Sequence, residues 1–257
     1  MILCIDIGNT QIHAGVFKEE NLILQFRYSS SEGMSSDQLG IFLKNILREH
    51  NLDPKSIHNI TICSVVPELD YSVRSACIKY FQLTPFFLNV GVKTGLKIKY
   101  SNPAEVGADR IATAVGANCL HPNQNIVIVD MGTATTIDIV NKEKEYLGGA
   151  ILPGLKSSVK ALYINTSKLP SVEIVKPKLG LGKSTKENIQ IGLFYGQLGA
   201  IKELIAYLTI QSFPNEEYII IATGGFSEVY RNENIFEAIY QELAFVGLRV
   251  ITNINKL

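Results

Sequence analysis

Two short segments of the sequence place an aspartate directly before a polar turn that contains glycine. Asp6-Ile-Gly-Asn-Thr follows one apolar run, and Asp130-Met-Gly-Thr-Ala-Thr-Thr follows another. Glycine permits such a tight turn, whose backbone N–H groups can bind phosphate oxygens. A carboxylate at the end of a buried strand is costly unless a cation lies near it, and hydrated magnesium on nucleotide phosphates would supply one. The two turns therefore predict binding of a nucleoside triphosphate.

The two turns belong to a repeat within the chain. Residues 2–22 and 126–147 both run from an apolar segment through Asp-x-Gly and a second apolar run to a Lys-Glu turn. A constant offset of 124 residues superposes Asp6 on Asp130, Gly8 on Gly132, Val16 on Val140, Lys18 on Lys142 and Glu19 on Glu143. The repeat predicts a duplicated α/β fold with two lobes, residues 1–121 and 122–257, and a nucleotide cleft between them.

A third segment, Gly107-Ala-Asp-Arg, follows an Asn-Pro turn and begins a predicted helix. Arg110 could bind a carboxylate or phosphate through two hydrogen bonds, and helix N-terminal amides favour anions. Asp109 could accept the proton of a substrate hydroxyl, as the catalytic aspartate of a kinase does. The same spacing also fits an acid that complements the helix dipole and an arginine on the surface. The spacing alone leaves both interpretations open.

Two further glycine motifs differ in how well they support a phosphate-binding site. Ala222-Thr-Gly-Gly ends a predicted strand and would let the backbone approach a phosphorylated ligand closely, although an ordinary strand-to-helix turn looks the same. Gly182-Lys-Ser-Thr resembles the end of a P-loop, but Pro177 stands where that motif needs its first glycine, and no strand precedes it. We therefore expect Ser184 and Thr185 to cap a long helix instead.

The apolar pattern predicts the elements that must hold these segments in place. In the first half we expect antiparallel strands at 3–7, 13–17 and 22–28 and later strands at 60–66 and 85–90. We expect helices at 37–49, with Ser36 and Asp37 as caps, at 71–81, and from Ala104 or Gly107 to about 120. In the second half we expect strands at 126–130, 136–141, 146–151, 218–223 and 250–254, and helices at 153–164, 184–210 and 234–245. Each half thus predicts a mixed sheet covered by helices.

The composition excludes several classes of function. There are 24 basic and 24 acidic residues, so no broad basic surface for nucleic acid or an anionic membrane is expected. The four cysteines are scattered, which predicts buried free thiols in a reducing cytoplasm. The four histidines show no metal-ligand spacing. Neither a signal peptide nor an apolar run long enough to cross a membrane is expected.

Five segments together resemble the type III pantothenate kinases, of the acetate kinase, sugar kinase and actin superfamily. They are Asp6-Ile-Gly-Asn-Thr, Asn102-Pro103 with Gly107-Ala-Asp-Arg110, Asp130-Met-Gly-Thr-Ala-Thr-Thr, Gly148-Gly-Ala-Ile-Leu-Pro-Gly154 and Ala222-Thr-Gly-Gly225. Each segment alone is a weak signal, but all five in this order and spacing are specific. The resemblance covers the chain from the first strand to the last helix and implies an actin-like fold.

The resemblance also implies a reaction, the ATP-dependent phosphorylation of pantothenate to 4′-phosphopantothenate, which begins coenzyme A synthesis. It implies Asp109 as proton acceptor, Asp130 as ligand of a monovalent cation (potassium or ammonium), and magnesium, near Asp6, accompanying ATP. It further implies a cytoplasmic homodimer with the pantothenate pocket at the subunit interface. The implied ATP contacts are Asp6, Ile7, Gly8, Asn9, Thr10, Gln11, Ile12, His13 and Thr133, and the implied pantothenate contacts are Tyr100, Gly107, Ala108, Asp109, Arg110 and Thr185.

Three other functions fit parts of the sequence. A kinase of the same superfamily could act on another acceptor, although Tyr100 and the Gly107–Arg110 segment favour pantothenate. A regulatory protein such as a Bvg accessory factor could share the fold, but it would be free to lose Asp109. A chaperone-like ATPase or a phosphatase would need extra substrate domains, for which 257 residues leave no room.

Overall fold

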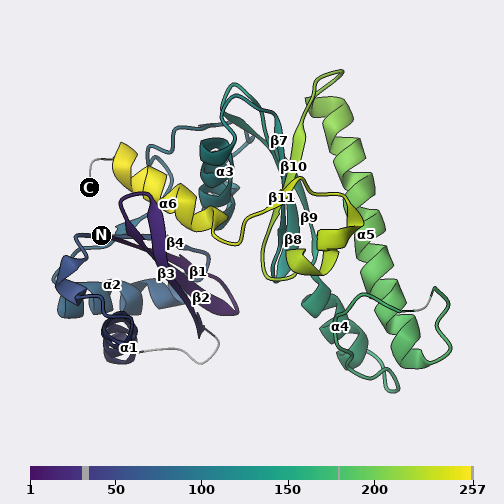
Figure 1. Cartoon of the computed structure of the whole chain (residues 1–257), viewed down its shortest axis with the longest axis horizontal. Helices are drawn as coiled ribbons and strands as arrows, with labels where there is room; N and C mark the ends of the chain where they lie inside the picture. The colour runs from purple at the N-terminus through teal and green to yellow at the C-terminus, as the bar shows by residue number, and fades with distance from the viewer. Residues whose placement is uncertain (31–34, 179, 256–257) are drawn as a thin grey trace. The chain divides into compact units, whose positions relative to one another are not determined.

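The computed structural model describes residues 1–30, 35–178 and 180–255. They form two compact units (Figure 1). Unit 1 comprises Met1–Leu120 and the segment from Glu242 onward, and unit 2 comprises His121–Gln241. The junction after Leu120 lies beside the lobe boundary expected at residue 121. The segment after Gln241, which we expect from the sequence in the second lobe, packs in unit 1 instead.

The sheet of unit 1 has the strand order β3-β2-β1-β4-β5. Its first three strands form the predicted antiparallel meander, and β1 also pairs in parallel with β4. The strands are β1 (Ile2–Ile7), β2 (Gln11–Lys18), β3 (Asn21–Ser29), β4 (Asn59–Ser64) and β5 (Phe86–Phe87). The strand predicted at 85–90 is therefore much shorter than expected.

Helices cover both faces of this sheet (Figure 1). Leu3, Ile5 and Ile7 of β1 enter the core beneath α1 (Ser36–Glu49) and α2 (Pro67–Phe81). Cys4 enters the core beneath α3 (Ala108–Leu120) and α6 (Leu243–Ile254). Because side chains alternate along a strand, Asp6 points to the same face as Cys4. The remaining elements of unit 1 are η1 (Pro54–Ser56), β6 (Lys97–Ile98) and η2 (Pro103–Glu105).

The end of the chain corrects two predictions. The helix predicted at 234–245 is absent, because Asn234 has a left-handed backbone and a short strand, β11 (Ala238–Ile239), follows it. The strand predicted at 250–254 lies within α6. This helix buries residues on nearly all of its surface, so its β-branched side chains imitate a buried strand in the sequence. Packing against α3 and the unit 1 sheet overrides that local preference.

Helix starts agree more closely with the sequence. Ser184 caps α5 (Thr185–Ser212) by accepting the Glu187 N–H, as expected from the rejected P-loop segment. The first helix begins at Ser36, but its cap is Ser35, not the predicted Ser36 or Asp37. Ser35 forms a capping box with Gln38, which satisfies donors at both positions.

The sheet of unit 2 repeats the order of unit 1. Among the strands that belong to unit 2, the order is β11-β10-β7-β8-β9, with β7 antiparallel to β8 and parallel to β10. Each strand therefore has a counterpart in unit 1, and the predicted duplication is confirmed. The elements are β7 (Ile126–Met131), β8 (Ala134–Val140), β9 (Glu145–Pro153), α4 (Leu155–Ile164), β10 (Ile219–Thr223) and η3 (Ser227–Glu233), with α5 packing its buried face onto the sheet.

The constant offset of 124 holds only up to the turns. Ile7 pairs with Ile12 across the first turn, whereas Met131 pairs with Thr135 across the second, so the second turn is one residue shorter. Structurally, Val16 corresponds to Ile139 rather than to Val140, because Leu3 pairs with Val16 and Val127 pairs with Ile139. The equivalences predicted for Lys18 and Glu19 shift in the same way.

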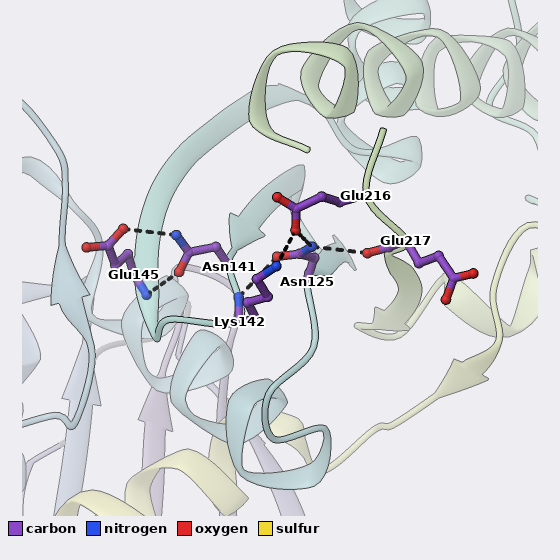
Figure 2. A network of polar contacts seen from close by, with 6 residues as sticks. All are labelled: Asn125, Asn141, Lys142, Glu145, Glu216 and Glu217. Atoms are coloured by element: carbon purple, nitrogen blue, oxygen red, sulfur yellow. Dashed lines mark hydrogen bonds and ion pairs between the residues drawn. The ribbon is translucent and has the colours of Figure 1, made fainter. Parts of the chain in front are cut away.

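A polar network closes the end of the unit 2 sheet where β7 begins (Figure 2). Asn125 donates to Glu216 Oε2 at 3.0 Å and to the Glu217 carbonyl at 3.1 Å, and its Oδ1 accepts the Lys142 N–H at 3.1 Å. Lys142 Nζ also lies 2.7 Å from Glu216 Oε2. The network joins the start of β7, the β8–β9 turn and the segment before β10.

The cysteines and the helices can be compared with the predictions of buried free thiols and of no membrane-spanning segment. Cys4, Cys63 and Cys77 are buried free thiols, as predicted, whereas Cys119 is free but exposed. Within the described ranges, none of the helices has the length and apolar character needed to span a bilayer.

Candidate active site

Asp6 and Asp109 form the acidic centre of unit 1. Asp6 lies at the carboxyl end of β1 and points toward the face covered by α3, and Asp109 lies in the first turn of α3. Burial, and then the negative charge of Asp109, together raise the pKa of Asp6 from 3.8 to about 6, against the opposing effect of a hydrogen bond from Cys63. Two acids from segments predicted separately thus act on each other within one unit.

Gly107 makes room for the Asp109 carboxylate. A Cβ atom on Gly107 would lie 2.5 Å from Asp109 Oδ1, too close for any side chain without rearrangement. The same oxygen accepts the Arg110 N–H at 2.8 Å. Arg110 itself is buried, so the reading of it as a surface charge is wrong. The glycine and the helix start together set the position of the carboxylate.

The first predicted phosphate turn is closed by its own backbone and by a residue that the sequence reading missed. The Gly8 N–H donates to the Gln11 carbonyl at 3.0 Å. Ser30 donates its hydroxyl to the Gly8 carbonyl at 2.8 Å and its N–H to the Thr10 carbonyl at 3.1 Å. A serine just after a strand gives no signal in a sequence, because its partner lies 22 residues away. Asn9 at the tip remains exposed.

The end of the predicted ATP stretch faces the protein interior. Ile12 belongs to the core beneath α1 and α2. The ring of His13 packs edge-on against Phe245 of α6, with 4.5 Å between ring centroids. Burial, and then the charge of Arg27, lower the pKa of His13 to about 4, so its imidazole is neutral at physiological pH. These side chains anchor β2, on which the turn depends.

In unit 2, three of the predicted segments meet at the second turn. The Gly132 N–H donates to the Ala134 carbonyl at 3.0 Å, and Ser157 of α4 donates to the Thr133 carbonyl at 2.7 Å. A Cβ atom on Gly154 would lie 2.5 Å from the Thr133 oxygen and 2.6 Å from the Gly132 oxygen. The glycine at the start of α4 therefore lets that helix approach the turn.

Gly224 brings the third segment onto Asp130. It has a φ of +84°, and a Cβ atom there would overlap Asp130 Oδ1 and lie 2.6 Å from the Met131 nitrogen. Ser227 donates to the Gly224 carbonyl at 2.7 Å, and the Phe226 N–H donates to the Met131 carbonyl at 3.1 Å. The Ala222-Thr-Gly-Gly motif is thus packed directly against the Asp130 turn, where only glycine fits.

The predicted acceptor contacts are divided between the units. Tyr100, Gly107, Ala108, Asp109 and Arg110 belong to unit 1, whereas Thr185 belongs to unit 2. Thr185 lies at the start of α5, on the wall of a cavity of about 750 Å³ between α4 and α5. The other walls are mainly apolar and include Ala161, Leu162, Ile189 and Leu193.

The donor set fits a cation that arrives with a phosphorylated ligand. Among the described residues, no three or more His, Cys, Asp or Glu side chains gather into a cluster that could hold a metal ion. Magnesium commonly takes one or two protein carboxylates and completes its shell with phosphates and water. Asp6, with the charge of Asp109 near it, provides such a partial site.

Known proteins resemble the chain in sequence and fold. The model of the type III pantothenate kinase family matches residues 2–207. The chain is 52% identical to type III pantothenate kinase of Legionella pneumophila (strain Paris) over 255 residues, 99% of each chain. It is 47% identical to type III pantothenate kinase 1 of Francisella tularensis subsp. holarctica (strain OSU18) over 256 residues, 100% of each chain.

Solved structures show the fold. A Baf family transcriptional activator from Campylobacter jejuni matches with a TM-score of 0.63 at 22% identity, over 99% of this chain and 98% of that one. MreB 5 of Spiroplasma citri matches with a TM-score of 0.53 at 12% identity, over 99% and 96%. The duplicated actin-like fold is thereby confirmed. By the sequence match over nearly its whole length, the chain belongs to the type III pantothenate kinase family.

Proposed function

We propose that this chain carries out its family's reaction, the ATP-dependent phosphorylation of pantothenate to 4′-phosphopantothenate, with Asp109 as the proton acceptor. The observation that carries the proposal is the pairing of Asp6 and Asp109. Two neighbouring carboxylates in a partly buried site make the local potential negative, which favours binding of a positive charge. A nucleotide with magnesium supplies that charge.

The two turns would bind the ATP phosphates. The turn from Asp6 to Thr10 offers backbone N–H groups and the exposed side chain of Asn9. The turn from Asp130 to Thr136 offers the exposed Thr133, and Ser157 and Gly154 support its backbone from α4. Charge neutralisation and positioning are the main demands of phosphoryl transfer, and these turns are suited to both.

The chemical step follows from the charges. Asp109 takes the proton of the primary hydroxyl of pantothenate, whose oxygen forms a bond to the γ-phosphorus as the bond from that phosphorus to the β,γ-bridging oxygen breaks. ADP leaves with the electrons of the broken bond. Magnesium, held through the phosphates near Asp6, would neutralise charge on the transferring group. The hydrogen bond from the Arg110 N–H and the space left by Gly107 hold the Asp109 carboxylate, which supports this role.

Acceptor recognition is proposed for Tyr100, Gly107, Ala108, Arg110 and Thr185. Pantothenate carries a carboxylate, and a buried guanidinium such as that of Arg110 is a strong partner for one. Thr185 lies on the wall of a cavity whose apolar surface suits the dimethyl part of the substrate. In line with the resemblance to the family, we propose that a homodimer completes the pocket, with Thr185 contributed across the interface.

Two further assignments belong to this proposal. Asp130 is proposed to bind a monovalent cation, potassium or ammonium, beside the Gly224 turn. The reaction is proposed to take place in the cytoplasm, since Cys4, Cys63 and Cys77 are kept as buried free thiols, which suits a reducing compartment.

The test is an assay of ADP release with pantothenate, ATP, magnesium and potassium. Asp109→Asn should keep its fold and its affinity for magnesium–ATP but lower kcat by about 100-fold or more, the usual cost of a lost general base. Glu68→Gln is the matched control, because Glu68 is another acid in the first turn of a helix, α2. Its turnover should be unchanged, which separates base catalysis from a helix-dipole effect.

Two outcomes would contradict the proposal. Near-normal turnover of Asp109→Asn would remove this residue from the mechanism. Binding of ATP by the wild-type protein without pantothenate-dependent ADP release would instead point to another acceptor, or to a regulatory protein that has kept the fold.

A further inference from the structure

Cys63 is a buried residue whose thiol touches the acidic centre. It lies on β4 with no exposed surface, and β4 pairs it in register with Asp6 of β1. Its Sγ donates to Asp6 Oδ1 at 3.2 Å. The hydrogen bond therefore joins the middle of the unit 1 sheet to a carboxylate of the proposed site.

A thiol is suited to orienting this carboxylate without neutralising it. An ionised carboxylate has no hydrogen to donate, so in this contact the Cys63 thiol is the donor and the Asp6 oxygen the acceptor. A lysine or arginine at this position would cancel the charge of Asp6 and compete with a cation. A neutral S–H group holds one carboxylate oxygen and leaves the negative charge in place.

The second unit places a donor side chain at the same point. Asp130 of β7 pairs in register with Thr223 of β10, just as Asp6 pairs with Cys63. Thr223 is also buried. Both aspartates of the repeat thus have a small side chain with a polar hydrogen beside them on the neighbouring parallel strand, although the two sequences differ there.

Simple core packing is the competing explanation, and Cys4 shows what it looks like. Cys4 is equally buried and belongs to the same cluster beneath α3 and α6. Within the described part of the chain, its thiol makes no hydrogen bond to a carboxylate. The two cysteines therefore share burial and surroundings but differ in the contact with Asp6, which makes Cys4 a matched control.

We propose that Cys63 is a positioning residue, whose thiol holds the Asp6 carboxylate in the orientation that serves magnesium–ATP. The proposal rests on the proposed function, because it assumes that Asp6 takes part in binding the nucleotide with its metal. Residues that orient a metal-binding group commonly contribute about 10- to 100-fold to metal affinity. The effect should therefore appear in the magnesium-dependent part of ATP affinity.

The experiment is calorimetric titration of ATP without pantothenate, once with magnesium and once with EDTA. The Kd measured with EDTA, divided by the Kd measured with magnesium, reports how much magnesium strengthens the binding of ATP. Cys63→Ala should reduce that ratio by about tenfold, and Cys63→Ser, which keeps a donor, should restore it. Cys4→Ala, which opens a comparable space in the same core, should leave the ratio as in the wild type. If Cys63→Ala does not fold, Cys63→Val fills the space without a donor and should show the same loss.

Asp6→Asn distinguishes a failure of the role inferred for Cys63 from a failure of the proposed nucleotide site. If Asp6→Asn lowers the ratio and Cys63→Ala behaves like Cys4→Ala, the inference about Cys63 is wrong and the proposed site stands. If Asp6→Asn leaves the ratio unchanged, Asp6 does not serve magnesium–ATP, and the proposed site and the role of Cys63 are both overturned.

Discussion

Gly116 of α3 and Gly247 of α6 face each other where the backbones of the two helices touch. A Cβ atom on Gly116 would overlap the carbonyl oxygen of Leu243, and one on Gly247 would overlap that of Ala112. Both obstacles are backbone atoms, which cannot turn aside as a side chain can. Since Asp109 begins α3, this crossing sets the distance of the proposed base from the sheet that carries Asp6.

Alanine at either position should therefore separate the helices. We expect Gly116→Ala or Gly247→Ala to lower the free energy of unfolding by about 1–3 kcal/mol, the usual cost of overpacking, and to lower kcat through displacement of Asp109. Gly199→Ala on α5 is the control, since a Cβ atom there meets open space. It should stabilise the helix by up to about 1 kcal/mol. Urea unfolding measures all three, and equal effects at Gly116 and Gly199 would contradict the close crossing.

The raised pKa of Asp6 predicts a pH-dependent cost to the ligand-free protein. The folded protein holds the Asp6 proton more tightly than the unfolded chain does, with a pKa of about 6 against 3.8. Above pH 6 the ionised carboxylate therefore opposes folding, by about 2–3 kcal/mol. Asp6→Asn should raise the free energy of unfolding by that amount at pH 7.5, while abolishing turnover.

The gain should have a defined pH profile. It should shrink as the pH falls through 6, reach about half at pH 5, and vanish below the ordinary carboxyl pKa of 3.8. Urea unfolding of both proteins without nucleotide at three pH values provides the comparison. A gain of the same size at every pH would show that Asn simply packs better, and no gain at pH 7.5 would contradict the raised pKa.

The assignment of a monovalent cation to Asp130 predicts a salt dependence. Turnover should be low in sodium or Tris buffer and rise with potassium at constant ionic strength. Asp130→Asn should lose this dependence, since the site then lacks its negative charge, while Lys142→Ala, far along the same hairpin, should keep it. A wild-type protein with equal turnover in sodium and potassium would remove this role from Asp130.

The polar network around Asn125 predicts a large difference between two neighbouring contacts (Figure 2). Asn125 is buried and makes hydrogen bonds through both atoms of its amide, so Asn125→Ala leaves the Lys142 N–H and the Glu217 carbonyl without this partner. We expect a loss of about 2 kcal/mol. Lys142→Ala removes only an exposed ion pair to Glu216 and should cost less than about 1 kcal/mol. Thermal unfolding distinguishes them, and equal losses would contradict the buried network.

The sequence predicted the elements that contain their own signals. Alternating apolar residues, Asp-x-Gly turns and the Ser184 cap are local features, and β1 to β3, β7 to β9 and the start of α5 lie where they indicate. The acidic residues of the candidate site were also found from local motifs. The proximity of Asp109 to Asp6 was not predicted, because it depends on how α3 packs against the sheet of unit 1.

What the sequence could not give depends on distant contacts. Ser30 and Cys63 carry no motif, and each gains its place from a strand far along the chain. α6 was misread because the β-branched run Val250-Ile251-Thr252 resembles a strand in a short window, whereas the helical period shows only over the whole element. The offset of 124 residues fails beyond the Asp-x-Gly turns, because the turn between β7 and β8 is one residue shorter than the turn between β1 and β2. No side-chain pattern in the sequence marks this difference in turn length.

The return of α6 to unit 1 has a consequence for the order of folding. Unit 2 is one continuous stretch, so all its residues are synthesised before α6. Unit 1 is begun first, but its core behind Cys4 is filled by the side chains of Phe245 and Leu248. Unit 1 therefore lacks part of its core until α6 has been synthesised. A protein stopped after Gln241 would thus have a complete unit 2 and an open unit 1, with the wall behind Asp6 missing.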